Sequence, residues 1–128
     1  NHAQENADHV FNQPQSSKHL LAKRAIRYME AHFTEPLSLG ELAESLGYSR
    51  YYFSHTFTEI VGCTAVHYLN LLRCNYAGIL LANEDYNVSQ IASLCGFTNS
   101  SYFTQTYKRL KGRLPSSDKL YQARPIDR

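Results

Sequence analysis

The residues best suited to chemistry in this sequence lie between positions 99 and 111, where hydrogen-bonding side chains are followed by basic ones. At helical spacing they share one side of a helix that Asn99 would cap. That side consists of Ser100, Ser101, Thr104, Gln105 and Lys108, with Arg109 beside it. Hydroxyl and amide groups suit the edges of DNA bases, and basic side chains suit phosphates. This chemistry therefore favours recognition over catalysis.

Two short helices joined by a tight turn are predicted to position this face, over residues 87–112. Asn87 is placed to cap the first helix, and Gln90 can reach back to it three residues later. Ala92 and Gly96 allow a close helix crossing, and glycine accepts the positive φ of a turn. The apolar sides are Val88, Ile91, Leu94 and Cys95 in the first helix, and Tyr102, Phe103, Thr106, Tyr107 and Leu110 in the second. We therefore predict a helix-turn-helix motif.

The same pattern occurs a second time, over residues 38–62. Gly47 corresponds to the turn glycine, and Phe53 and Phe57 stand where the other motif has its inner aromatic residues. Ser49 would cap the second helix of this motif, whose outward residues are Arg50, Tyr51, Ser54 and His55. Two copies of one hairpin are hard to obtain by chance, so the duplication strengthens the prediction of both motifs.

Several blocks of residues share a pattern with one known family. They are Ser38-Leu39 with Glu41-Leu42-Ala43, Gly47-Tyr48-Ser49, Phe53 with Phe57, Gly62-Cys63-Thr64 with Tyr68, Arg73 with Ala77 and Leu80-Leu81, Ile91-Ala92, Gly96-Phe97, Ser101-Tyr102-Phe103, Lys108, Gly112 and Pro115. On these residues the range from Lys18 to about Lys119 resembles the DNA-binding domain of the AraC/XylS family of bacterial transcription regulators. The resemblance implies an all-α, seven-helix domain of two helix-turn-helix subdomains joined by a long central helix.

The resemblance also implies sequence-specific binding of double-stranded DNA, with one recognition helix of each motif in adjacent major-groove segments. The expected DNA-binding residues are Arg50, Tyr51, Ser54, His55, Arg73, Asn99, Ser100, Ser101, Thr104, Gln105, Lys108 and Arg109. For Arg73 two roles remain open, a phosphate contact or a brace between the two halves. RNA polymerase is a further implied partner, and whether the protein activates or represses stays open.

The central helix is predicted over residues 64–83, with a buried stripe at its apolar positions. The stripe is Val66, Leu69, Leu72, Tyr76 and Leu80. Twenty residues at about 1.5 Å each make a rod of roughly 30 Å. Adjacent major-groove segments on one side of DNA lie about 34 Å apart, so a rod of this length could serve both motifs of one monomer.

The ends of the chain are predicted to lie outside the domain. Residues 1–17 form a polar tail or interdomain linker, the domain covers 18–121, and 122–128 form a second tail. After Pro115 the sequence departs from the family pattern, since Asp118 stands where an aromatic residue is usual. The packing there is therefore open, and Tyr121 is a candidate to fill that place.

Composition excludes several classes of protein. With 128 residues, 43% of them hydrophobic, the chain is about one domain long and can build a modest core. Its three cysteines lack metal-ligand spacing and leave one unpaired, so they are expected to be reduced in a cytoplasmic protein. No apolar run is long enough to cross a membrane, so we expect no membrane association.

Two other kinds of function compete with DNA binding. We find no catalytic motif and expect no enzyme activity, no cofactor and no metal ligand. A protein-interaction module could use the same exposed helices, but only phosphate binding releases counterions on the scale of DNA binding. In this family such a domain is usually the C-terminal part of a longer regulator that senses a small molecule. A dimer would then form only through a missing N-terminal domain, and a short stand-alone regulator is the alternative.

The two motifs differ in charge. Residues 38–62 carry one basic and three acidic side chains, a net charge of −2, whereas residues 99–128 carry a net +5. Because cations near phosphates set the non-specific affinity, we expect the second motif to supply most of it.

Overall fold

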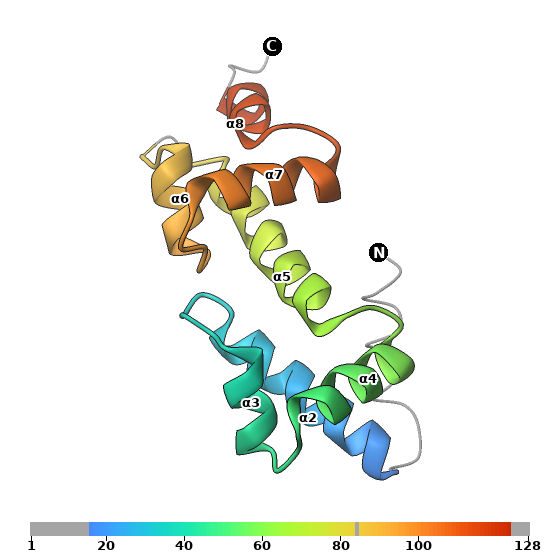
Figure 1. The fold of residues 1–128 in the computed structure, drawn as a ribbon. Helices are drawn as coiled ribbons and strands as arrows, with labels where there is room; N and C mark the ends of the chain where they lie inside the picture. The colour runs from blue at the N-terminus through green and yellow to red at the C-terminus, as the bar shows by residue number, and fades with distance from the viewer. Residues whose placement is uncertain (1–15, 84, 124–128) are drawn as a thin grey trace. The chain divides into compact units, whose positions relative to one another are not determined.

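The computed structural model of the chain describes the backbone of residues 16–83 and 85–123, with side chains up to residue 119. These residues form seven α-helices, α2 to α8, and contain no strand (Figure 1). The predicted all-α, seven-helix fold is confirmed. The predicted tails, apart from positions 16–17 and 122–123, and the side chain of Tyr121 lie outside the described residues.

Residues 33–36 and those from Asn70 onward form one compact unit, here unit 2, and the other described residues form unit 1. Unit 1 contains α2 (Ser17–His32), α3 (Leu39–Ser45) and α4 (Arg50–Val61). Both α2 and α3 pack against α4. The fully buried side chains of unit 1 include Leu21, Ile26, Met29, Phe53 and Phe57. The amphipathic patterns of the helices thus bury their apolar sides in a shared core.

Unit 2 contains α6 (Val88–Leu94), α7 (Ser100–Lys111) and α8 (Pro115–Ala123), which follow the second part of α5 (Ala65–Leu80). Their buried residues form one cluster. It consists of Cys74, Ala77, Leu81, Ile91, Ala92, Cys95, Phe97, Phe103 and Tyr107. Four of these side chains are small, namely Cys74, Ala77, Ala92 and Cys95.

Helix α5 differs from its prediction in length and in its buried side. It has 16 residues rather than the twenty of the range 64–83, and so is about 24 Å long. The helix is therefore shorter than the distance of about 34 Å between adjacent major-groove segments. Val66 was predicted to be buried but is 51% exposed, while Tyr68, Leu71, Cys74 and Ala77 are buried. Periodicity gave weight to the bulky residues, whereas close packing uses the small Cys74 and Ala77.

Two residues of the second motif were also assigned to the wrong side. Leu94 and Tyr102 were predicted to face inward but are 43% and 44% exposed. Leu94 lies about 100° around α6 from Cys95, at the margin of the buried side. Tyr102 likewise lies about 100° around α7 from the buried Phe103. Its hydroxyl accepts a hydrogen bond from the Asn70 side chain at 2.9 Å.

Side-chain caps begin the helices of both motifs as predicted. Asn87 and Gln90 form a reciprocal capping box, with both hydrogen bonds at 2.8 Å. Asn99 accepts the Tyr102 amide at 2.9 Å, and Ser49 accepts the Tyr52 amide at 3.1 Å. These bonds are local, so each helix start follows from residues within three positions of it.

The segment after Pro115 is closed by a buried carboxylate instead of an aromatic ring. Asp118 is 2% exposed, accepts a hydrogen bond from the Tyr107 hydroxyl at 2.6 Å and pairs with Arg113. Burial raises the pKa of Asp118, but the hydrogen bonds from Tyr107 and Arg113 outweigh it and hold the pKa below its usual value. Burial and the bond to Asp118 together raise the pKa of Tyr107. The packing left open by the sequence is therefore provided by polar contacts.

Replacing the two turn glycines should separate backbone strain from steric clash. Gly47 and Gly96 both have positive φ, at 90° and 100°. A Cβ on Gly47 would meet nothing within 4 Å, whereas one on Gly96 would clash with the Phe33 carbonyl oxygen. We expect Gly47→Ala to lower the free energy of unfolding by about 1–2 kcal/mol, from the left-handed backbone alone. Gly96→Ala and Gly96→Val should lower it further, as measured by denaturant unfolding. Equal losses at both positions would contradict the contact at Phe33.

Removing the charge of Asp118 should destabilise the protein in a pH-dependent way. Because the pKa of Asp118 is lowered in the folded state, its contribution is present above its unfolded pKa of about 4 and is lost as pH falls through the folded pKa. Asp118→Asn should therefore lower the free energy of unfolding by about 1–3 kcal/mol at pH 7, and by less near pH 3. Unfolding curves across this range test it, with Asp85→Asn as an exposed control. A deficit that stays constant with pH would exclude this charge contribution.

Candidate nucleic-acid interface

The second recognition helix, α7, presents its predicted polar face. Its buried side is Phe103, Thr106 and Tyr107, which fix the rotation of the helix about its axis. The opposite side is exposed at Ser100, Ser101, Gln105, Lys108 and Arg109, and half-buried at Thr104. Ser100, Ser101, Thr104 and Gln105 line a shallow hollow of about 250 Å³. The short hydroxyl side chains and the longer amide side chain of Gln105 thus lie next to one another on α7.

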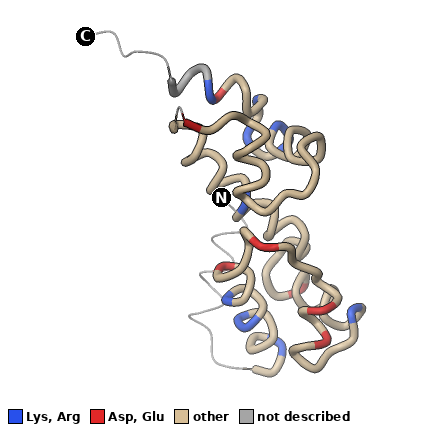
Figure 2. The backbone as a smooth tube through the Cα atoms, turned by 90° about the vertical axis from the view of Figure 1, so that its left-hand side faces the viewer, with Lys and Arg blue, Asp and Glu red and all other residues tan. Residues whose placement is uncertain are grey.

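The basic residues of the second motif lie in the last turn of α7, and Figure 2 colours the Lys and Arg positions of the backbone blue. Lys108 and Arg109 are exposed there, and the ammonium group of Lys111 donates to the Asn75 side chain at 2.6 Å. In unit 1, Lys18 forms an exposed ion pair with Glu59 of α4 at 3.3 Å. The difference in charge between the motifs is therefore also a difference between the exposed surfaces of α7 and α4.

The first recognition helix, α4, exposes Arg50, Tyr51, Ser54 and His55 as predicted. Tyr51 is 74% exposed, and its ring lies 4.5 Å from the His55 ring between centroids. The Arg50 side chain lies along α3, since its Cδ atom is 3.6 Å from the position of a Cβ on Gly40. This face is therefore mainly aromatic, unlike that of α7.

Arg73 is buried within unit 2. It is 9% exposed, and its guanidinium donates to the carbonyls of Phe33 at 2.7 Å and Glu35 at 3.1 Å. The same group lies 5.6 Å from the centre of the Phe97 ring. Burial lowers the pKa of Arg73 from its ordinary value. These contacts hold the 33–36 segment inside unit 2, and both roles expected for Arg73, the phosphate contact and the brace between the two halves, stay predictions.

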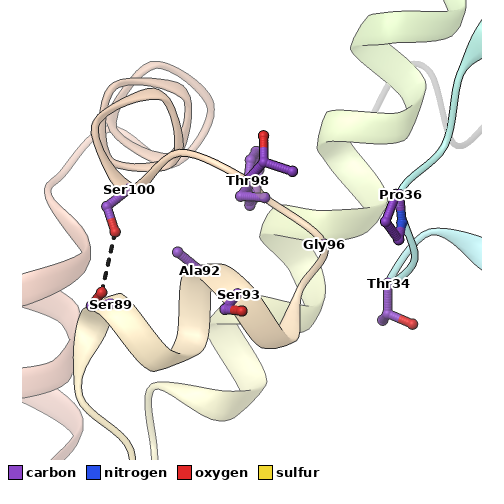
Figure 3. A pocket seen from close by; sticks show the side chains of 9 residues that line it. Thr34, Pro36, Ser89, Ala92, Ser93, Gly96, Thr98 and Ser100 are labelled. Atoms are coloured by element: carbon purple, nitrogen blue, oxygen red, sulfur yellow. Dashed lines mark hydrogen bonds between the residues drawn. The ribbon is translucent and has the colours of Figure 1, made fainter.

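A pocket of about 470 Å³ beside α7 was missed by the sequence analysis (Figure 3). It lies in unit 2 between the 33–36 segment, α6 and the turn before α7. Hydroxyl groups line it at Thr34, Ser89, Ser93, Thr98 and Ser100, and the Ser89 and Ser100 oxygens lie 3.4 Å apart. No local signal in the sequence could place Thr34 beside α6, because they are more than fifty residues apart.

In the described part of the chain, no group of three or more His, Cys, Asp or Glu side chains is arranged to hold a metal ion. None of its helices is long and apolar enough to cross a membrane. The three cysteines are free, with Cys74 and Cys95 buried and Cys63 half-buried. Burial raises the pKa of Cys74 to about 11, so this thiol stays protonated at neutral pH.

Comparison with known proteins agrees with the geometry of the two motifs. The sequence model of a helix-turn-helix domain family matches residues 42–119. An uncharacterised HTH-type transcriptional regulator from Staphylococcus aureus is 38% identical over 88 residues, which cover 69% of this chain. The match spans only 12% of the length of that regulator.

Solved structures show the same fold. An AraC-type transcriptional regulator from Chromobacterium violaceum is 28% identical, with a TM-score of 0.71, and the match covers 88% of this chain and 100% of that one. The DNA-binding domain of AdpA, a global transcriptional factor in complex with a target DNA, is 24% identical with a TM-score of 0.72. That match covers 78% of this chain and 90% of the AdpA domain. The chain therefore belongs to the AraC-type family of helix-turn-helix transcription regulators, as the DNA-binding domain of that family.

Proposed function

We propose that the chain binds specific sequences of double-stranded DNA by inserting α4 and α7 into adjacent major-groove segments. The observation that carries this proposal is the exposed face of α7, where hydroxyl, amide and basic groups stand opposite a fully buried inner side. The proposed DNA contacts are the residues predicted on α4 and α7 together with Asn99, which caps α7. Arg73 is not among them. The AdpA domain, which has the same fold, was solved in complex with a target DNA, and this supports binding to DNA.

We further propose that the chain is the DNA-binding part of a longer, effector-responsive regulator in the cytoplasm. Its match to the Staphylococcus regulator, which is much longer, supports this. In such a protein the remaining part would sense the effector and form any dimer, and RNA polymerase would be the second partner. Selection of bound sites from random duplexes tests the DNA-binding function. Binding with no preferred sequence and no salt dependence would favour the protein-interaction module instead.

Gln105 is expected to read one base pair. Its exposed amide lies one helical turn after Ser101 and can make paired hydrogen bonds to N6 and N7 of adenine. Gln105→Ala should weaken binding to the best site by about 1–3 kcal/mol and flatten the preference at one position. Site selection with the mutant measures both effects. An unchanged preference at every position would show that Gln105 is not a reader.

The salt dependence of binding should come mainly from the second motif. Removing Lys108 and Arg109 together should flatten the slope of log K against log[salt] by about two units, since each lost phosphate contact changes it by about 0.9. Arg50→Ala should change the slope by no more than about one unit, because Arg50 is the one basic residue of positions 38–62. Titrations at several salt concentrations on specific and random duplexes measure the slopes. A larger effect of Arg50→Ala would make the first motif the electrostatic anchor.

A further inference from the structure

The exposed surface of α4 is aromatic where that of α7 is hydrogen-bonding. Tyr51 is 74% exposed, and its ring stays against the His55 ring one turn later. Beside this pair, Tyr52 is 41% exposed and stacks on Tyr48, with 5.5 Å between the ring centroids. Aromatic rings therefore cover much of the first half of α4. Covering such exposed aromatic side chains with a partner lowers the free energy.

The first motif itself carries little positive charge. Arg50 is its one basic residue, and the Cδ and Nε atoms of Arg50 lie close to Gly40 of α3. Glu41 and Glu44 of α3 are exposed, and Glu59 of α4 pairs with Lys18. The motif thus offers a negative duplex less charge attraction than α7 does, so we expect contact between apolar groups to contribute more at α4.

The major groove offers one apolar group to such a surface, the C5-methyl of thymine. On the basis of the DNA-binding function above, we propose that the Tyr51 ring recognises thymine through this methyl group and that His55 positions the ring. The α7 face instead reads hydrogen-bonding groups through Gln105 and its neighbouring hydroxyls. The binding site then has two unlike halves, and only the half read by α4 depends on thymine methyl groups.

Replacing single thymines of the selected site by deoxyuridine tests this directly, because it removes the methyl group and leaves base pairing intact. Wild type should lose about fourfold in affinity at one or two positions, the factor expected from burying one methyl-sized group. Tyr51→Ser should bind the thymine and deoxyuridine duplexes equally. Tyr51→Phe should keep the fourfold ratio, since it keeps the ring and loses only the hydroxyl.

Two control substitutions lie outside the exposed face of α4. Tyr28 on α2 is 43% exposed and stacks on His32 with the same four-residue spacing, at 4.3 Å. Because Tyr28 lies outside both recognition helices, Tyr28→Ser should keep the fourfold ratio. Gln105→Ala should also keep it, although its affinity for the best site falls. Melting temperatures near that of wild type would show that the exposed substitutions leave the fold intact.

The role of His55 has its own test. His55→Ala should reduce the ratio between thymine and deoxyuridine because Tyr51 loses the ring beside it, and His55→Phe should restore the ratio. The proposal is overturned if no thymine shows a methyl effect in wild type, or if Tyr51→Ser retains the effect. It is also overturned if Tyr51→Phe loses the effect, because the hydroxyl would then be the recognising group. Wild type that binds DNA without sequence preference would instead refute the proposed function itself.

Discussion

The second motif depends on a close backbone approach at Gly96. The turn between α6 and α7 requires positive φ there, and the Phe33 carbonyl oxygen occupies the space that a side chain would need. That carbonyl also accepts the hydrogen bond from Arg73, whose guanidinium lies beside the Phe97 ring. The Phe33 carbonyl therefore contacts both the turn before α7 and the buried guanidinium of Arg73, and this holds the 33–36 segment in unit 2.

Both motifs use the same construction, a buried inner side with an exposed outer side, yet their outer sides carry different chemistry. In α7 the inner Phe103 and Tyr107 leave hydroxyl, amide and basic groups outside. In α4 the inner Phe53 and Phe57 leave paired aromatic rings outside. The scaffold is repeated and the surfaces are not, so the chemistry that each motif exposes differs without any change of fold.

The last helix shows how a departure from a family pattern can be accommodated. Asp118 replaces an aromatic ring by a hydrogen bond to Tyr107 and an ion pair with Arg113. A buried carboxylate with both oxygens engaged is tolerated where an unpaired one would be costly. Tyr107 is itself part of the core of unit 2, so this polar contact connects α8 to the helix that carries the recognition face.

The sequence by itself determined what depends on neighbouring residues. Caps such as Asn87 with Gln90 and the turn glycines follow from interactions within about four positions, and they were predicted. The exposed faces of α4 and α7 were predicted except for Tyr52 and Tyr102. Only the tertiary structure decided the buried side of α5, the backbone partners of Arg73, the partners of Asp118 and the pocket beside α6. These depend on segments as far apart as Phe33 and Arg73, which local periodicity cannot bring together. Close packing then selects small side chains that a count of bulky residues overlooks.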